Sequence, residues 1–274
     1  MENFKKRLIL SFIINLLMII FFISAMICII VDNINNPNSI YQTFWGLFRY
    51  FTNDGNLLSC IFNFIIVIKQ FQVLRRKTEK EIKEKTISHF LYIISLTSTV
   101  NEIVIFIVVM VIFLPLANND IIIALIGTYK GSSVHITIPL LMTFRFLFLD
   151  QRKRQLKIYE KFFGGIPMLI YGIIMYILCG TKVFTSFDKK YGDAKIPYPF
   201  FDLYHQSWYF CFFIGIFIFI FGFGISFLFD LLNKKCEKLI FPYDSSLDNL
   251  DSDFKEEKNL LSDSSSIEES FKEQ

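Results

Sequence analysis

Six apolar runs of membrane-spanning length are the feature that most constrains the fold of this chain. A transmembrane helix needs about 20 mostly apolar residues to cross the hydrocarbon core of a bilayer. The runs cover residues 8–31, 44–68, 87–114, 131–149, 162–180 and 208–232. With 53% apolar residues, 34 Phe and a mean hydropathy of +0.47, the chain exceeds what a soluble domain of 274 residues shows. We therefore predict an all-α, polytopic membrane protein with six transmembrane helices.

Three parts are expected along the chain: a basic leader at residues 1–7, the six-helix domain at 8–232 and an acidic cytoplasmic tail at 233–274. The first run resembles a signal peptide only superficially, because it exceeds the 7–15 apolar residues of such a segment and no small-residue cleavage site follows. We interpret it as an uncleaved first span. The start of the fourth span is open, since the apolar run at 121–126 either extends it or forms a re-entrant turn.

The distribution of Lys and Arg predicts the orientation of the spans. Basic residues crowd the leader, the loops after the second and fourth spans, and the start of the tail, whereas the other three loops carry zero, one and four. By the positive-inside rule, both termini face the cytoplasm, and we expect the protein in the cell membrane. From Tyr243 onward, ten acidic and three basic residues, with many Ser, predict disorder. The net charge of +3 averages these unlike parts, so nucleic acid is not an expected partner.

Cysteine and histidine usage predicts no metal site and no cofactor. The five cysteines form no C-x-x-C pair, and most lie inside apolar runs. This pattern favours neither a disulfide framework nor a thiolate metal site. Only three histidines are present, too few for a histidine-rich cage. The sequence does not predict an oligomeric state.

The second span is the most polar of the six. Because helical neighbours recur every three or four residues, most of its polar side chains share one stripe, which we expect to face the protein interior. Polar groups at membrane depth are expensive and usually mark functional sites. The candidate residues of this span are Arg49, Thr52, Asn53, Asp54, Asn56 and Asn63.

Other spans supply candidate partners for this stripe. Glu102 interrupts the third span, His135 lies near the start of the fourth, and His205 stands at the mouth of the sixth beside Asp202. From the rise of 1.5 Å per residue, Thr52, Glu102 and His135 lie roughly 12, 18 and 6 Å below the outer ends of their helices. They could meet in one pocket open toward the outer leaflet. A hydroxyl, an imidazole and carboxylates in a dry pocket are the components of nucleophilic acyl chemistry.

Short motifs at these positions resemble the androgen-induced transmembrane hydrolase family and its predicted six-transmembrane bacterial relatives. Residues 50–57, YFTNDGNL, are similar to the family's F-T motif, which in bacterial members is Y-F-T-x-x-S-N-L. Gly55 replaces the serine of that motif. Residues 135–141, HITIPLL, are similar to the H-x-x-x-P-L-L segment, and residues 198–202, YPFFD, to a Y-P-F sequence before the last helix. With helix count and spacing, the resemblance spans about residues 8–232.

The resemblance implies an intramembrane lipid-ester hydrolase. Animal members of the family hydrolyse fatty-acid esters of hydroxy fatty acids with a threonine nucleophile and a histidine base. At the matching positions these are Thr52 and His135. A membrane lipid or lipid-like ester would reach such a site by lateral diffusion, and a threonine hydroxyl becomes nucleophilic when a base takes its proton. Asn53, Asn56 and Arg49 could stabilise the oxyanion.

Structural roles and other chemistries stay open for the same residues. Thr52 could bond to a carbonyl one turn earlier, and His135 could bond to a neighbouring helix. Arg49 could form an interior ion pair with Asp54 or Glu102, and the third catalytic group is Asp54, Glu102 or no carboxylate.

Two further alternatives concern the nucleophile and the function. Cys60, two turns after the threonine, is a reserve nucleophile because a related acyltransferase branch uses a cysteine with histidine. The alternative function is a non-enzymatic transport or small-molecule-binding protein that uses the same polar pocket. Without a clear internal repeat, the sequence gives a transporter less support.

Overall fold

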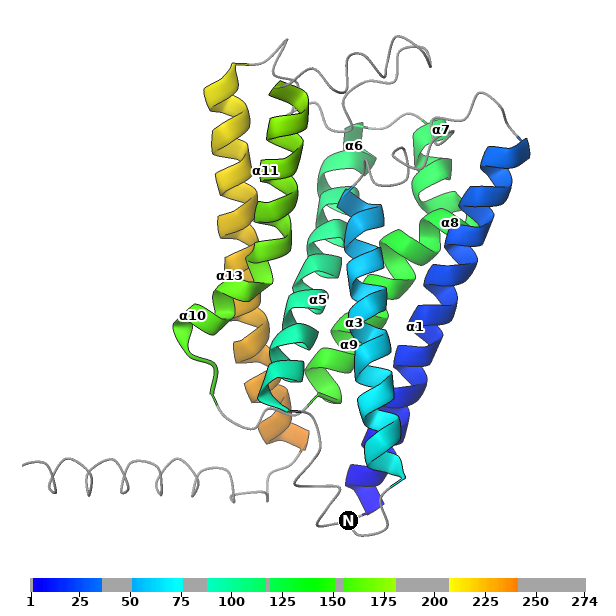
Figure 1. Ribbon diagram of the computed structural model, residues 1–274, viewed down its shortest axis with the longest axis vertical. Coiled ribbons are helices and arrows are strands. Elements are labelled where there is room, and N and C mark those ends of the chain that lie inside the picture. Colours follow the sequence, from blue (N-terminus) through cyan, green and yellow to red (C-terminus); the bar gives the residue numbers. More distant parts are fainter. Residues whose placement is uncertain are drawn as a thin grey trace, which may run out of the picture.

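The computed structural model describes residues 2–35, 51–75, 88–116, 119–150, 155–180 and 207–240, and every regular element within these ranges is helical. Six helical stretches are long and apolar enough to cross a membrane (Figure 1). This confirms the predicted all-α, six-span membrane architecture. The cytoplasmic placement of the termini stays a prediction from charge. Arg49, His205, residues 198–202 and residues 241–274 lie outside the described ranges.

The α-helices supply most of each span, and short stretches of wider or tighter helix complete three of them. The α-helices are α1 (Glu2–Asn35), α3 (Phe51–Leu74), α5 (His89–Ile107), α6 (Leu114–Leu116), α7 (Asn119–Ile122), α8 (Tyr129–Ser132), α9 (Ile138–Phe148), α10 (Ile158–Lys161), α11 (Ile166–Gly180) and α13 (Trp208–Ile240). The π-helical stretches are η1 (Val108–Phe113), η2 (Ile123–Gly127) and η3 (Ser133–Thr137), and the 3₁₀ stretch is η4 (Phe162–Gly165).

The helices extend past several predicted boundaries by a turn or more. The leader from residue 2 onward is part of α1, and α13 continues to residue 240, so the helical domain does not end at 232. Asn233, predicted to open the tail, is fully buried. The fourth span begins at α8, where Thr128 has extended backbone (φ −100°, ψ 154°) and caps the helix. The run at 121–126 is helical, in α7 and η2, but the extended backbone of Thr128 separates it from the span, which covers Tyr129–Phe148 (Figure 1).

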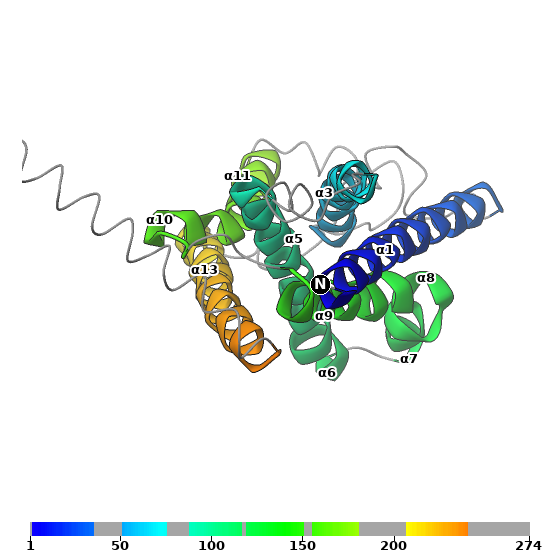
Figure 2. The same cartoon turned by 90° about the horizontal axis from the view of Figure 1, so that it is seen from below.

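Helix α5 occupies the centre of the bundle. Figure 2 shows it with α3, α9, α11 and α13 around it, and α1 outside α3 and α9. Its interior position follows from its sequence, because apolar and small polar side chains cover it almost all round. The main apolar core includes residues of α5 and of the helices around it: Tyr92, Leu96, Val100, Val104, Phe146, Leu156, Met168, Ile225 and Phe229.

Small residues let η4 and α13 approach closely beside α5. A Cβ atom built on Gly164 would lie 2.6 Å from Ser226 Cβ and 3.3 Å from a Val100 methyl group. Glycine at this crossing therefore sets the distance between the helices, as small residues do in membrane bundles generally. By contrast, a Cβ atom on Gly172 of α11 would meet nothing within 4 Å.

The outward faces of the bundle are apolar. On α1, Ile20 and Ile27 are more than half exposed, and on α13 the same holds for Phe213 and Phe217. An apolar surface of this extent suits lipid tails, since soluble monomers rarely expose large contiguous apolar patches. The lipid-facing and core-facing surfaces are therefore distinguished mainly by small polar residues on the core side.

Replacing Gly164 by Ala tests the close crossing. Because the new methyl group overlaps the Cβ of Ser226, which cannot move without its backbone, Gly164→Ala should destabilise the protein by about 1–3 kcal/mol. Gly172→Ala is the matched control and should be neutral or slightly stabilising, because alanine favours helix and has open space there. Thermal unfolding of the detergent-solubilised variants measures both. Equal melting temperatures for the two variants would contradict the assigned crossing.

Candidate functional site

A stripe of polar side chains on α3 faces the bundle interior, as predicted. Asn56 and Asn63 are 1% and 2% exposed, and Ser59 and Gln70 share their face at helical spacing. Thr52, Asn53 and Asp54 are partly buried in the first turn of α3. The stripe leads to two separate polar regions, one around Arg145 and one around Thr52, His135 and Glu102.

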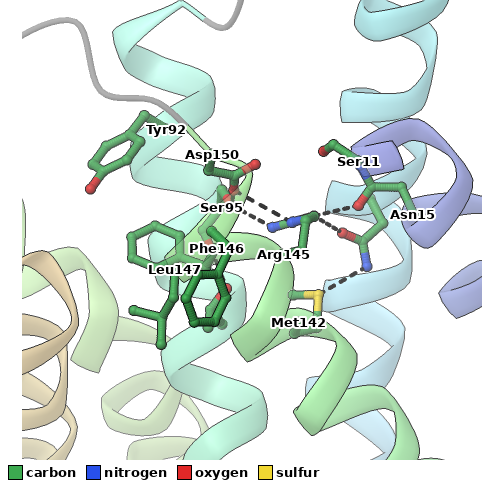
Figure 3. Close-up of polar contacts among 12 residues, drawn as sticks. Ser11, Asn15, Tyr92, Ser95, Met142, Arg145, Phe146, Leu147 and Asp150 are labelled. Carbon is green, nitrogen blue, oxygen red and sulfur yellow. Dashed lines mark hydrogen bonds and ion pairs between the residues drawn. The ribbon is translucent and has the colours of Figure 1, made fainter. Parts of the chain in front are cut away.

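Arg145 lies at the centre of the first region, near the end of α9, and is completely buried (Figure 3). Its Nη1 donates to Oδ1 of Asn15 on α1 and to Oδ1 of Asn63 on α3, the latter at 2.7 Å. Nη2 donates to Ser95 Oγ on α5. Nε lies 3.4 Å from Asp150 Oδ2, which also accepts from Ser95. The guanidinium is thus bound from three neighbouring helices and by one carboxylate.

Amide side chains continue this network between α1 and α3. Asn15 Nδ2 donates to Gln70 Oε1 at 3.0 Å, and Gln70 Nε2 donates to Ser11 Oγ at 2.8 Å. Asn63 Nδ2 points to the Met142 sulfur at 3.4 Å. We call Arg145, Asp150, Ser95, Asn63, Asn15, Gln70 and Ser11 the Arg145 network.

Asn233 joins α13 to the same region. Its Nδ2 donates to the carbonyl oxygens of Phe146 at 2.6 Å and Asp150 at 3.1 Å, which end the α9 helix. Its Oδ1 accepts from the Tyr92 hydroxyl at 3.1 Å. Most polar atoms here bind within the protein, and Arg145 Nε and Asp150 Oδ1 are the buried atoms of this pair without a hydrogen bond. The region therefore mainly holds helices together.

The second region begins at η3, where Pro139 changes the backbone pattern. The N–H of Ile138 donates to Ser133 five residues earlier, and Pro139 has no N–H. The carbonyl of Val134 therefore has no donor within its own helix. His135, the next residue, lies in the middle of this π-helical stretch, and such stretches occur frequently at functional sites.

Asn56 connects this carbonyl, which lacks a donor in its own helix, to the start of α3. Its Nδ2 donates to Thr52 O at 2.7 Å and lies 3.5 Å from Val134 O. The turn that carries Thr52 is thereby held beside the turn that carries His135. One amide side chain, that of Asn56, therefore connects these two turns, although the sequence predicted different depths for Thr52 and His135.

The reactive atoms near this bridge are not bound to each other. His135 is 9% exposed and its Nδ1 has no hydrogen-bond partner. Within the described part of the chain, no hydrogen bond joins it to the Thr52 hydroxyl. Catalytic hydrogen bonds are often long in ligand-free enzymes and tighten when substrate binds. A partly buried hydroxyl and a buried, unoccupied imidazole nitrogen on adjacent turns could carry out proton transfer.

Glu102 on α5 lies among further buried polar groups. Its two carboxyl oxygens, both side-chain atoms of Asn101, and the hydroxyls of Ser59 and Ser98 have no hydrogen-bond partner, and all four residues are at most 1% exposed. The Ser59 hydroxyl faces the Glu102 carboxyl, although the pair falls outside hydrogen-bond geometry. We call these four residues the Glu102 cluster. No hydrogen bond links it to His135.

Gly55 lies where α3 and α5 come closest. A Cβ atom there would press on the side-chain amide of Asn101 and lie 2.8 Å from Ile105 Cδ1. A serine at this position, as in the bacterial motif, would require both side chains to shift. Cys60 packs with the apolar side chains around Met142, so the reserve nucleophile lies off the buried polar stripe.

Sequence reasoning missed the central position of Arg145 and the two serines of the Glu102 cluster. An arginine near the end of a span usually indicates only which side of the membrane that end faces. In the preceding span, however, polar residues recur at helical spacing: Ser95, Ser98, Asn101 and Glu102. That recurrence is the signal that could have revealed a second polar face.

Substituting Arg145 tests the Arg145 network. Arg145→Gln leaves Asp150 buried without its cation, so the free energy of unfolding should fall by about 3–5 kcal/mol. Adding Asp150→Asn removes that uncompensated charge and should restore part of the loss. Denaturation in mild detergent, followed by tryptophan fluorescence, compares the two variants. A double variant that is less stable than the single one would contradict the pairing.

No family model, no curated protein and no solved structure matches this chain. Its function is therefore inferred from the site.

Proposed function

We propose that the protein is an integral membrane lipid-ester hydrolase in which Thr52 is the nucleophile and His135 the general base. The observation that carries the proposal is the Asn56 bridge, which holds the turn of Thr52 against the π-helical turn of His135. The motif resemblance at residues 50–57 and 135–141 supports the same pair.

In the proposed reaction, His135 accepts one proton and gives it back in each of the two steps, acylation and deacylation. A ring nitrogen of His135 takes the proton of Thr52 Oγ1, and the oxygen attacks the ester carbonyl. The same nitrogen then protonates the departing alcohol, which leaves an acyl-threonine. Water, deprotonated by His135, releases the fatty acid and regenerates the hydroxyl. No metal or cofactor is needed in this sequence.

Asn56 acts as a positioning residue in this mechanism. Its amide N–H groups are directed at two backbone carbonyls, so it is a poorer oxyanion donor than the sequence implied. Asn53 and Arg49 stay the proposed oxyanion donors. Asp54, which is partly buried two residues after the nucleophile, and His205 stay candidates for the pocket rim.

The surroundings suit a lipid substrate. The apolar, outward faces of the bundle let an acyl chain approach from the bilayer. From the charge pattern we expect the site to lie toward the outer leaflet of the cell membrane, where a lipid ester would enter sideways.

The Arg145 network favours hydrolysis over transport. A transport path from the Thr52 region must continue to the other membrane face, past α9. There Arg145 is completely buried and bound to side chains of α1, α3 and α5. A non-enzymatic permease would need this network to open in every cycle, at the cost of exposing a buried ion pair.

Labelling with a lipophilic fluorophosphonate tests the assignment. Thr52→Ala and His135→Ala should each lower the labelling rate, and the hydrolysis of a fluorogenic fatty-acyl ester, by about 100-fold or more. Thr52→Ser should retain labelling because it keeps the hydroxyl. The purified full-length protein in detergent is the sample, and its melting temperature verifies folding.

Two matched controls separate chemistry from packing. Ser24→Ala removes a hydroxyl that bonds to Tyr129, and His89→Gln removes an imidazole that pairs with Glu160. Both variants should label like the wild type. Labelling of the wild type that persists in Thr52→Ala, or no labelling of the wild type, would exclude the threonine mechanism.

A further inference from the structure

The Glu102 cluster is not used by the proposed hydrolysis, yet its polar atoms are unsatisfied. Glu102 is 0% exposed, and neither of its carboxyl oxygens has a hydrogen-bond partner. An ionised carboxylate in a membrane interior is strongly unfavourable unless a positive charge compensates it. Something outside the described side chains is therefore expected to balance or neutralise this group.

Among the described residues, the completely buried cation Arg145 does not do so. Arg145 is bound to Asp150 and to three neutral side chains. Along α5, its contact Ser95 lies seven residues before Glu102, roughly 10 Å away at the helical rise. Within the described residues, no Lys, Arg or His forms an ion pair with Glu102.

Buried neutral polar groups on α5 and α3 lie beside the carboxylate instead. Ser98 lies one turn before Glu102 on the same face of α5, and Ser59 faces it from α3. Both hydroxyls, and the side-chain oxygen of Asn101, are buried without partners. Such a set of hard oxygen atoms, donated by two helices, resembles the ligands of alkali and alkaline-earth ions rather than those of zinc or copper.

We propose that the Glu102 cluster binds one monovalent cation, with Na⁺ as the ion that the short serine and asparagine ligands can reach. Glu102 supplies the single negative charge, and Ser59, Ser98 and Asn101 supply neutral oxygens. A divalent ion would leave a net charge in the dry interior, because the cluster holds only one carboxylate. The ion would tie α3 to α5 and does not depend on the proposed hydrolysis.

Ion-dependent stability tests the site. The full-length protein in detergent is heated in NaCl or in choline chloride at equal ionic strength. A ligand that binds only the folded state raises the melting temperature in proportion to the logarithm of its concentration. Wild-type protein should melt roughly 2–8 °C higher in saturating NaCl than in choline chloride.

Variants assign the effect to these residues. Glu102→Gln should abolish the difference between the two salts. Ser59→Ala and Ser98→Ala keep the carboxylate and should each raise the Na⁺ concentration for half-maximal stabilisation by about tenfold. Ser24→Ala, outside the cluster, should respond like the wild type.

Two results would overturn the proposal. One is a wild-type protein whose melting temperature is the same in both salts, as expected if Glu102 is protonated. The other is an undiminished Na⁺ response in the two serine variants. Because melting is measured without substrate, neither result depends on whether Thr52 is a nucleophile.

Discussion

A guanidinium in a membrane must have its donors bound by the protein, and this requirement organises the bundle around Arg145. Oxygen atoms from α1, α3 and α5 converge on it, and Asp150 supplies the charge. In lipid, the hydrophobic effect does not drive helices to associate with one another. Hydrogen bonds and close packing must therefore hold the helices together. Arg145 provides the first, and the small residues at the η4–α13 crossing provide the second.

With one end of the bundle fixed in this way, the other end can carry unsatisfied polar groups. Pro139 frees a backbone carbonyl in the fourth span, Asn56 binds it, and His135 is left with an unoccupied ring nitrogen. The Glu102 cluster lies between this place and the Arg145 network. A polar region whose side chains mostly bind one another, next to a region whose polar side chains lack partners, is the arrangement expected when the second region is reserved for a ligand.

The six spans and the interior face of α3 were predictable, because length, hydropathy and helical spacing are local properties of the sequence. The Arg145 network was not, since nothing near Arg145 in the chain indicates that Asn15 and Asn63 will lie beside it. The same limit applies to the site. Helical rise gave different depths for Thr52 and His135, whereas the Asn56 bridge between their two turns depends on a proline-induced change of backbone register and on one asparagine.

The order of residues along the chain has a consequence for biogenesis. An isolated helix that carries arginine enters the membrane less readily than a wholly apolar one. The side-chain partners of Arg145 on α1, α3 and α5 all precede it in the sequence, and Asp150 follows within two turns. When the fourth span leaves the ribosome, its hydrogen-bond acceptors are already synthesised. The earlier helices can therefore bind the arginine-bearing span as it inserts, which would couple insertion of this span to tertiary assembly.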